Sequence, residues 1–169
     1  MFNRKTARLA ISELTREDGE LMLAILNDPD FIHNVADRGV RTVQEAQDYI
    51  EKGPVASYRR HNFGMYKVAL KDGTAVGLCG LVKRDFLDDV DIGYAFLPQY
   101  RGRGYALEAA QAVMDFARNG LGLKRIVAIV SPANPRSIAL LEKLGMRSEG
   151  CVTVPDDNKE VALLAWQSV

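Results

Sequence analysis

The stretch that decides the fold lies in the middle of the chain, where residues 91–106 read DIGYAFLPQYRGRGYA. Its first six residues are strand-like, and the loop that follows contains Gly102 and Gly104. Apolar residues at helical spacing then continue to Asn119 and predict the strongest helix of the chain. A strand, a glycine loop and a helix in this order predict an anion site. Glycines let backbone amides approach phosphate oxygens, and the first turn of a helix offers unpaired N–H groups.

The identity of the phosphate ligand is narrowed by what this loop lacks. No Gly-Lys-Ser/Thr follows the glycines, so the loop is not a P-loop. Leu107 occupies the position of the third glycine of a dinucleotide fingerprint. Arg101 or Arg103 can add positive charge to a phosphate site here. The two glycines alone are equally compatible with an ordinary tight turn before a helix.

Outward from this stretch, the residue pattern predicts alternating strands and helices. Strands are expected at residues 9–14, 65–70, 75–82, 90–96, 125–130, 146–152 and 160–166. Helices are expected at residues 15–27, 42–53, 104–119 and 134–145. Asp28-Pro29 and Gly53-Pro54 are expected to end the first two helices, and the chain from there to Asn62 is expected to be irregular. Strands joined by short turns, which pair antiparallel, come first along the chain, and strands separated by helices follow them. We therefore expect an α/β fold with a mixed sheet and helices on both faces.

Length and composition bound the remaining possibilities. A chain of 169 residues that is 47% hydrophobic predicts one domain spanning residues 1–169. Lys and Arg number 22 and Asp and Glu number 22, which disfavours nucleic acid and membrane surfaces as partners. No apolar run approaches the ~18 residues of a membrane-spanning helix. Cys79 and Cys151 are far apart and form no zinc-type spacing. The basic first residues lack the apolar stretch of a signal peptide, so we expect a cytoplasmic location.

Two motifs resemble those of the GNAT acetyltransferase superfamily. Residues 99–104, QYRGRG, match the Q/R-x-x-G-x-G/A signature of that family. Residues 134–137 followed by Leu144-Gly145-Met146 are similar to its second motif. More narrowly, residues 8–9, 26–29, 80–81 and 89–94 resemble the RimJ/RimL-type branch, whose members acetylate protein N-termini. The resemblance implies a GNAT fold: about seven strands, mostly antiparallel, with a splayed parallel pair at the centre.

The resemblance also implies acetyl-CoA as co-substrate and no metal. The amides of residues 101–106 would bind the pyrophosphate, and the end of the preceding strand would offer backbone groups to the pantetheine arm. The residues implied in cofactor binding are Phe96, Leu97, Gln99, Arg101, Gly102, Arg103, Gly104, Tyr105, Ala106, Asn134 and Ser137.

The catalytic residues are less directly indicated. Direct acetyl transfer needs a neutral amine, donors for the developing oxyanion and a proton for the departing thiolate. In the family, a carboxylate at the start of the strand before the loop often serves as base, which points to Asp91 and Asp89; solvated loop charge is the alternative. Many relatives carry a tyrosine acid where this chain has Leu141. RimL-like members are thought to use a serine at the position of Ser137. A first-turn serine that bonds back toward Asn134 is the alternative.

The acceptor amine is the least defined part. In the family the first helices and the loop after them form the acceptor side, which implicates Phe31, His33, Tyr58 and Phe63 as wall residues. A protein N-terminal amine and a small amine, such as an amino acid, polyamine or drug, both fit. Because Leu141 replaces the tyrosine, a non-catalytic acetyl-CoA sensor is a third function. A nucleic-acid module built on residues 101–104 is disfavoured by the balanced charge. Dimers are common among relatives, so a homodimer is also considered.

Overall fold

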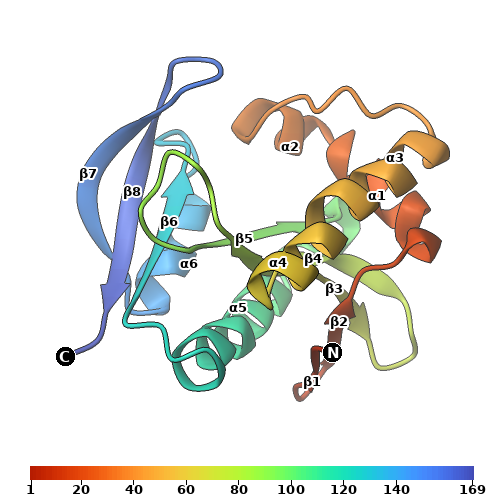
Figure 1. Cartoon of the computed structure of the whole chain (residues 1–169), viewed down its shortest axis with the longest axis horizontal. Coiled ribbons are helices and arrows are strands. Elements are labelled where there is room, and N and C mark those ends of the chain that lie inside the picture. Colours follow the sequence, from red (N-terminus) through yellow and green to blue (C-terminus); the bar gives the residue numbers. More distant parts are fainter.

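The computed structural model describes all 169 residues and places eight strands in one sheet, in the order β1-β2-β3-β4-β5-β6-β8-β7 (Figure 1). The strands are β1 (Asn3–Lys5), β2 (Leu9–Glu13), β3 (Met65–Leu70), β4 (Ala75–Val82), β5 (Asp91–Phe96), β6 (Arg125–Val130), β7 (Arg147–Val154) and β8 (Lys159–Gln167). All seven expected strands are present. The eighth, β1, was missed because three polar residues carry no alternation, and it is recruited by antiparallel pairing with β2.

The centre of the sheet is a parallel pair of strands that barely touch. β5 and β6 share one register pair, Asp91 with Val127, and the Val127 amide donates to the Val90 carbonyl at 3.0 Å. In contrast, β5 makes six register pairs with β4, and β6 makes six with β8. The two halves of the sheet therefore diverge beyond Asp91 (Figure 1). This confirms the predicted splay.

Helices cover both faces of the sheet, as expected. They are α1 (Gly19–Leu26), α2 (Pro29–Asn34), α3 (Val43–Ile50), α4 (Ala56–His61), α5 (Tyr105–Asp115) and α6 (Pro135–Lys143). Helix α5 buries Ala109, Val113 and Met114 in the largest core cluster, against strand residues of one face. Helices α1 and α3 form a second cluster that includes Leu78 of β4. None of the helices combines the length and the apolar character needed to cross a membrane.

Of the two proline-containing segments expected to end helices, Asp28-Pro29 does follow the end of α1 and also begins α2, whereas Gly53-Pro54 does not end a helical segment. Asp28 accepts a hydrogen bond from the Phe31 amide at 3.3 Å and caps α2, whose first residue is Pro29. The Gly53-Pro54 pair lies inside a π-helical turn, Glu51–Val55, that joins α3 directly to α4. A wider turn tolerates a proline that lacks an N–H group. The stretch expected to be irregular is thus helical until Asn62, whose φ of 67° ends α4.

Candidate active site

The loop between β5 and α5 presents a run of unpartnered backbone amides. Gly102 and Gly104 adopt φ values of 73° and 82°, a conformation that side chains disfavour. The amides of residues 102–104 make no hydrogen bond within the protein, and the first bond of α5 runs from the Glu108 amide to the Gly104 carbonyl at 3.1 Å. The amides of residues 105–107 belong to the first helical turn and have no intrahelical acceptor. We call residues 102–107 the amide loop, and its six donors fit an anion.

Two guanidinium groups lie beside the amide loop. A Cβ atom built on Gly104 would lie 3.2 Å from Nη2 of Arg8, and one built on Gly102 would lie 3.8 Å from Nη2 of Arg136. Arg8 is fixed in place because its Nε donates to Glu108 at 2.7 Å and its Nη1 to the Arg103 carbonyl at 2.8 Å. Arg136 forms no ion pair and adds net positive charge beside the loop, whereas the charge of Arg8 is offset by Glu108. Neither was assigned to the phosphate site from the sequence.

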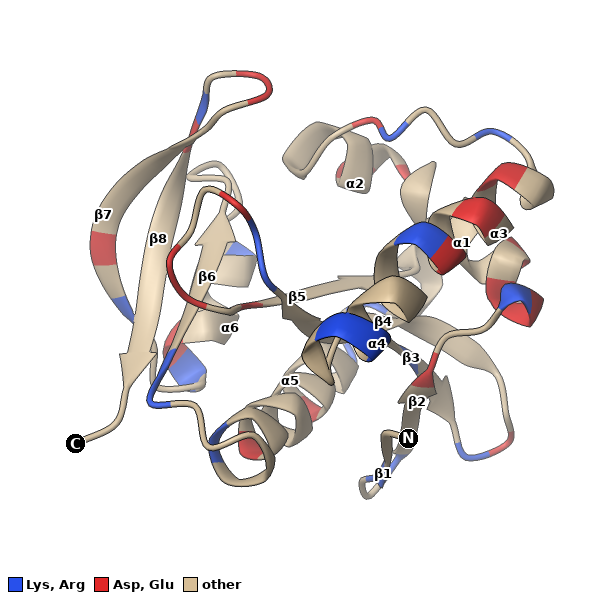
Figure 2. Ribbon diagram, in the orientation of Figure 1, with Lys and Arg blue, Asp and Glu red and all other residues tan.

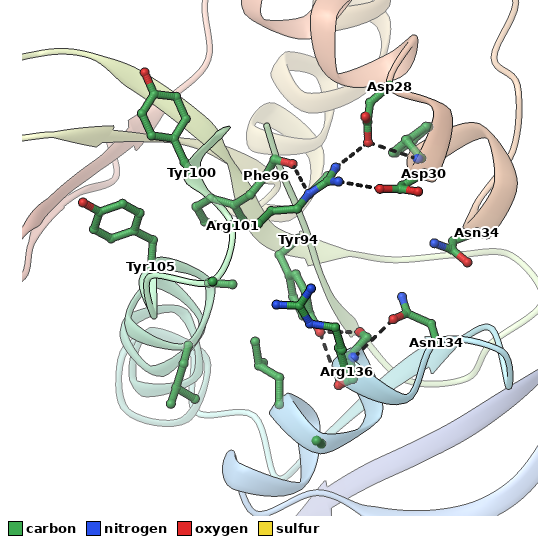
Figure 3. Close-up of a pocket in the computed structure, with 18 of the residues that line it drawn as sticks. Asp28, Asp30, Asn34, Tyr94, Phe96, Tyr100, Arg101, Tyr105, Asn134 and Arg136 are labelled. Atoms are coloured by element: carbon green, nitrogen blue, oxygen red, sulfur yellow. Dashed lines mark hydrogen bonds and ion pairs between the residues drawn. The ribbon is translucent and has the colours of Figure 1, made fainter. Parts of the chain in front are cut away.

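Arg101, one of the two arginines expected to supply that charge, makes other contacts. Its guanidinium forms ion pairs with Asp28 and with Asp30, the latter at 2.5 Å, and its Nε donates to the Phe96 carbonyl at 3.0 Å (Figure 3). Its backbone amide donates to Pro98 at 3.3 Å. Arg101 therefore ties the start of the loop to α2. Its side chain and its amide are both already bonded within the protein.

The amide loop borders a groove of about 570 Å³, the loop groove, formed with β5, α2 and α6. The expected cofactor residues that line it are Phe96, Arg101, Gly102, Gly104, Tyr105, Ala106, Asn134 and Ser137. Leu97, Gln99 and Arg103 do not line it. The Leu97 amide is already bonded to the Val76 carbonyl at 3.0 Å, and Gln99 is exposed. Arg136 extends from the start of α6 into the groove (Figure 3).

A second cavity of about 570 Å³, the sheet cavity, is lined by residues of β4, β5, β6, α2 and α4 and of the β7–β8 hairpin. The residues that line both spaces are Phe31, Asn34, Val35, Tyr94, Ala95, Asn134 and Ser137. The loop groove and the sheet cavity therefore meet at the splay. Two ligands bound in these spaces would have their ends brought together there.

A pair of hydroxyl groups marks this junction. The Tyr94 hydroxyl is hydrogen-bonded to Oγ of Ser137 and lies 3.4 Å from the Ser137 carbonyl oxygen. The Ser137 amide donates to the Asn134 side chain at 3.3 Å, so Asn134 caps α6, and the Ser137 hydroxyl faces Tyr94 instead of bonding back to the backbone. Burial raises the pKa of Tyr94 to about 12, so it is protonated at neutral pH. Leu141 is buried in the core.

The two candidate bases lie in different surroundings. Asp91 is 1% exposed, and its Oδ2 accepts from Nε of Arg84 at 3.0 Å. Its Oδ1 makes no hydrogen bond within the protein, and the residue lines the sheet cavity. Burial raises the pKa of Asp91, and the Arg84 guanidinium opposes that rise. Asp89 instead pairs with Arg125 at 3.0 Å and lines neither space, because β5 begins only at Asp91.

The four residues expected to form the acceptor wall occupy different positions in the structure. Phe31 lines both spaces, whereas His33 is exposed and lines neither. Tyr58 donates to the Met65 carbonyl and stacks on Tyr66, and Phe63 is buried in the core. Tyr58 and Phe63 therefore stabilise the β3 side of the fold and do not form the wall. His61, to which no role was assigned, lines the sheet cavity.

Comparisons with known proteins agree with this arrangement. Residues 8–147 match the family model described as the acetyltransferase (GNAT) domain. The uncharacterized N-acetyltransferase YnaD of Bacillus subtilis is 30% identical over 146 residues, which cover 86% of this chain and 82% of that protein. The structure of a GNAT-family acetyltransferase from Bacillus anthracis is 28% identical, covers 98% of both chains and gives a TM-score of 0.81.

The fold is also shared with RimL, a ribosomal L7/L12 α-N-protein acetyltransferase solved in complex with coenzyme A. That structure is 18% identical, covers 96% of both chains and gives a TM-score of 0.81. At this identity the likeness concerns the fold alone. The match of the family model over most of the chain goes further: this protein belongs to the GNAT superfamily and is an acyl-CoA-dependent N-acetyltransferase.

Proposed function

We propose that this enzyme transfers the acetyl group of acetyl-CoA to a primary amine by direct attack at the junction of the loop groove and the sheet cavity. The observation that carries the proposal is the amide loop. Its six unpartnered amides lie beside Arg8 and Arg136, at one end of a groove that leads to the hydroxyl pair. The acceptor amine would enter from the sheet cavity. A protein N-terminal amine and a small amine are both included.

The binding of acetyl-CoA follows from backbone geometry. The amide loop would hold the pyrophosphate, with Arg8 and Arg136 as added cations. The Val90 carbonyl faces β6, and backbone groups of alternate strand residues point to the same side. The backbone groups of Tyr94 and the amide of Phe96 therefore face the splay, where β6 no longer pairs with them, whereas the Phe96 carbonyl already accepts a hydrogen bond from Arg101. The Tyr94 groups and the Phe96 amide, rather than the backbone groups of Leu97, would bind the pantetheine amides.

The chemistry divides among three side chains. Acetyl-CoA, when bound, supplies the activated acetyl group as a thioester. Ser137 Oγ holds a proton for the departing sulfur, and the Tyr94 hydroxyl fixes the position of that proton. Asp91 lies three residues along β5 from Tyr94, so the two side chains leave opposite faces of the strand, but both residues line the sheet cavity. We therefore assign Asp91 Oδ1 as the acceptor of the amine proton through water.

The proposal is tested by following the release of CoA thiol from acetyl-CoA with a panel of amino acids, spermidine and short peptides, with mass spectrometry of the products. We expect release with at least one amine. Gly104→Glu should weaken acetyl-CoA binding by about 100-fold or more, because a carboxylate fills the loop and repels phosphate. Gly73→Glu is the matched control, since Gly73 also has positive φ, 94°, but lies in the β3–β4 turn. Tight binding without release for every amine would contradict the proposal and favour a sensor.

Ser137→Ala should lower kcat by about 100-fold through loss of the proton donor, with the Kd for acetyl-CoA nearly unchanged. Tyr94→Phe keeps the ring but removes the hydroxyl that positions Ser137, so its effect on kcat should be smaller, about tenfold. Single-turnover rates and calorimetric Kd values separate these effects. An equal loss in kcat and in acetyl-CoA affinity would make Ser137 a cofactor contact instead.

Asp91 should control the pH dependence of the reaction. Its carboxyl group can accept a proton only when ionised, so kcat/KM should fall as the pH drops through a pKa raised above the usual aspartate value. Asp91→Asn should remove this acid limb and lower kcat/KM by about 100-fold, while the ionisation of the acceptor amine is the same in both enzymes. If the variant keeps both the rate and the acid limb, Asp91 only anchors Arg84.

A further inference from the structure

The sheet cavity carries a surplus of positive charge, although the chain as a whole has 22 basic and 22 acidic residues. Six basic residues line the cavity: Arg38, Lys52, Arg60, Lys83, Arg84 and Lys159. Three acidic residues line it, Asp91, Asp156 and Asp157, and no glutamate does. The space assigned to the acceptor is therefore more basic than the rest of the protein.

Half of these basic groups are already bonded within the protein. Lys83 donates to the carbonyls of Arg84 and Leu87, at 3.1 and 2.5 Å. Arg84 pairs with Asp91, and Lys159 Nζ lies 3.4 Å from the His33 carbonyl. These contacts hold the β4–β5 loop and the β7–β8 hairpin in position.

The other three basic groups have no partner. Arg38, Lys52 and Arg60 are exposed, and none forms an ion pair or a side-chain hydrogen bond within the protein. They come from three separate segments: the α2–α3 connection, the π-helical turn and α4. Figure 2 shows positive charge on α4 and at the start of the β4–β5 loop. We call Arg38, Lys52 and Arg60 the basic rim.

A basic rim discriminates among amines by charge. It repels an acceptor that carries several ammonium groups and attracts one that also carries an anion. It also favours the neutral form of the reacting amine, because nearby positive charge opposes protonation, and only the neutral amine is nucleophilic. Asp156 and Asp157 lie on the opposite, β7–β8 side, where Asp157 already accepts from the Lys159 amide at 3.0 Å.

We propose that the acceptor is a primary amine that also carries a carboxylate, which the basic rim binds while the amine reaches the junction. This inference rests on the proposed function and narrows its acceptor class. Free amino acids and the N-termini of acidic peptides share this chemistry. Polyamines do not.

The inference is tested with matched acceptors that differ only in charge. Alanine is compared with alaninamide, and the peptide Ser-Glu-Glu-Ala with Ser-Gln-Gln-Ala, both amidated at the C-terminus, with spermidine as the polycation. The kcat/KM of CoA release should be at least about tenfold higher for the more anionic member of the favoured pair, and lowest for spermidine. The preference should shrink as salt rises, since exposed charges are screened. The pair with the larger ratio of kcat/KM values shows whether free amino acids or peptides are the preferred acceptors.

Neighbouring arginines on α4 provide a matched pair of variants. Arg60→Gln should reduce the preference for the anionic acceptor by about three- to tenfold through a higher KM, with the Kd for acetyl-CoA unchanged. Arg59→Gln removes the same charge from the next residue, which is also exposed but does not line the cavity, and should leave the preference intact.

The outcomes that overturn the inference differ from those that overturn the proposed function. Amines without a carboxylate, spermidine included, that react as well as their matched carboxylates would overturn the inference and leave the acetyltransferase assignment of the junction standing. Equal losses in Arg59→Gln and Arg60→Gln would overturn the assignment to the basic rim. Absence of CoA release with every amine would overturn the proposed function itself, and the inference with it.

Discussion

The single register pair between β5 and β6, Asp91 with Val127, sets the geometry of the whole site. Val127 donates to Val90, and beyond this point each strand pairs only with its outer neighbour. One edge of β5 is thereby left with backbone donors and acceptors that a continued sheet would have paired. Such groups require partners, whether from side chains or from a ligand. The splay creates the junction and also the need for something to bind there.

Long-range side-chain contacts hold the elements around this opening. Tyr94 of β5 reaches Ser137 of α6 across the splay, and Arg101 links the loop before α5 to Asp28 and Asp30. Asp91 closes the β4–β5 loop through Arg84 and still has one unbonded oxygen. The groups assigned to proton transfer thus also stabilise the walls of the site. This explains why a cavity between diverging strands can keep a defined shape.

The parts of the fold that were predictable depend on local pattern. Short apolar, β-branched or alternating runs identified seven of the eight strands, and glycines before an amphipathic helix identified the amide loop. The partners of that loop were not predictable, because Arg101 and Asp28 are separated by 73 residues and Tyr94 and Ser137 by 43. Asp89 and Asp91 were both candidate bases, and their separation was not predictable because it depends on their tertiary partners, Arg125 and Arg84. The basic rim was equally hidden, since its three residues come from segments that only the tertiary fold brings to one cavity.

The central claim is that the unpartnered amides of residues 102–107 bind the pyrophosphate of acetyl-CoA. The most direct measurement is a titration of the ¹⁵N-labelled protein with CoA, followed through backbone amide chemical shifts, with dephospho-CoA and pantetheine as comparisons. We expect the largest shifts at these six amides, retained with dephospho-CoA, which keeps the pyrophosphate, and lost with pantetheine, which lacks it. Large shifts elsewhere with these six amides unmoved would contradict the account.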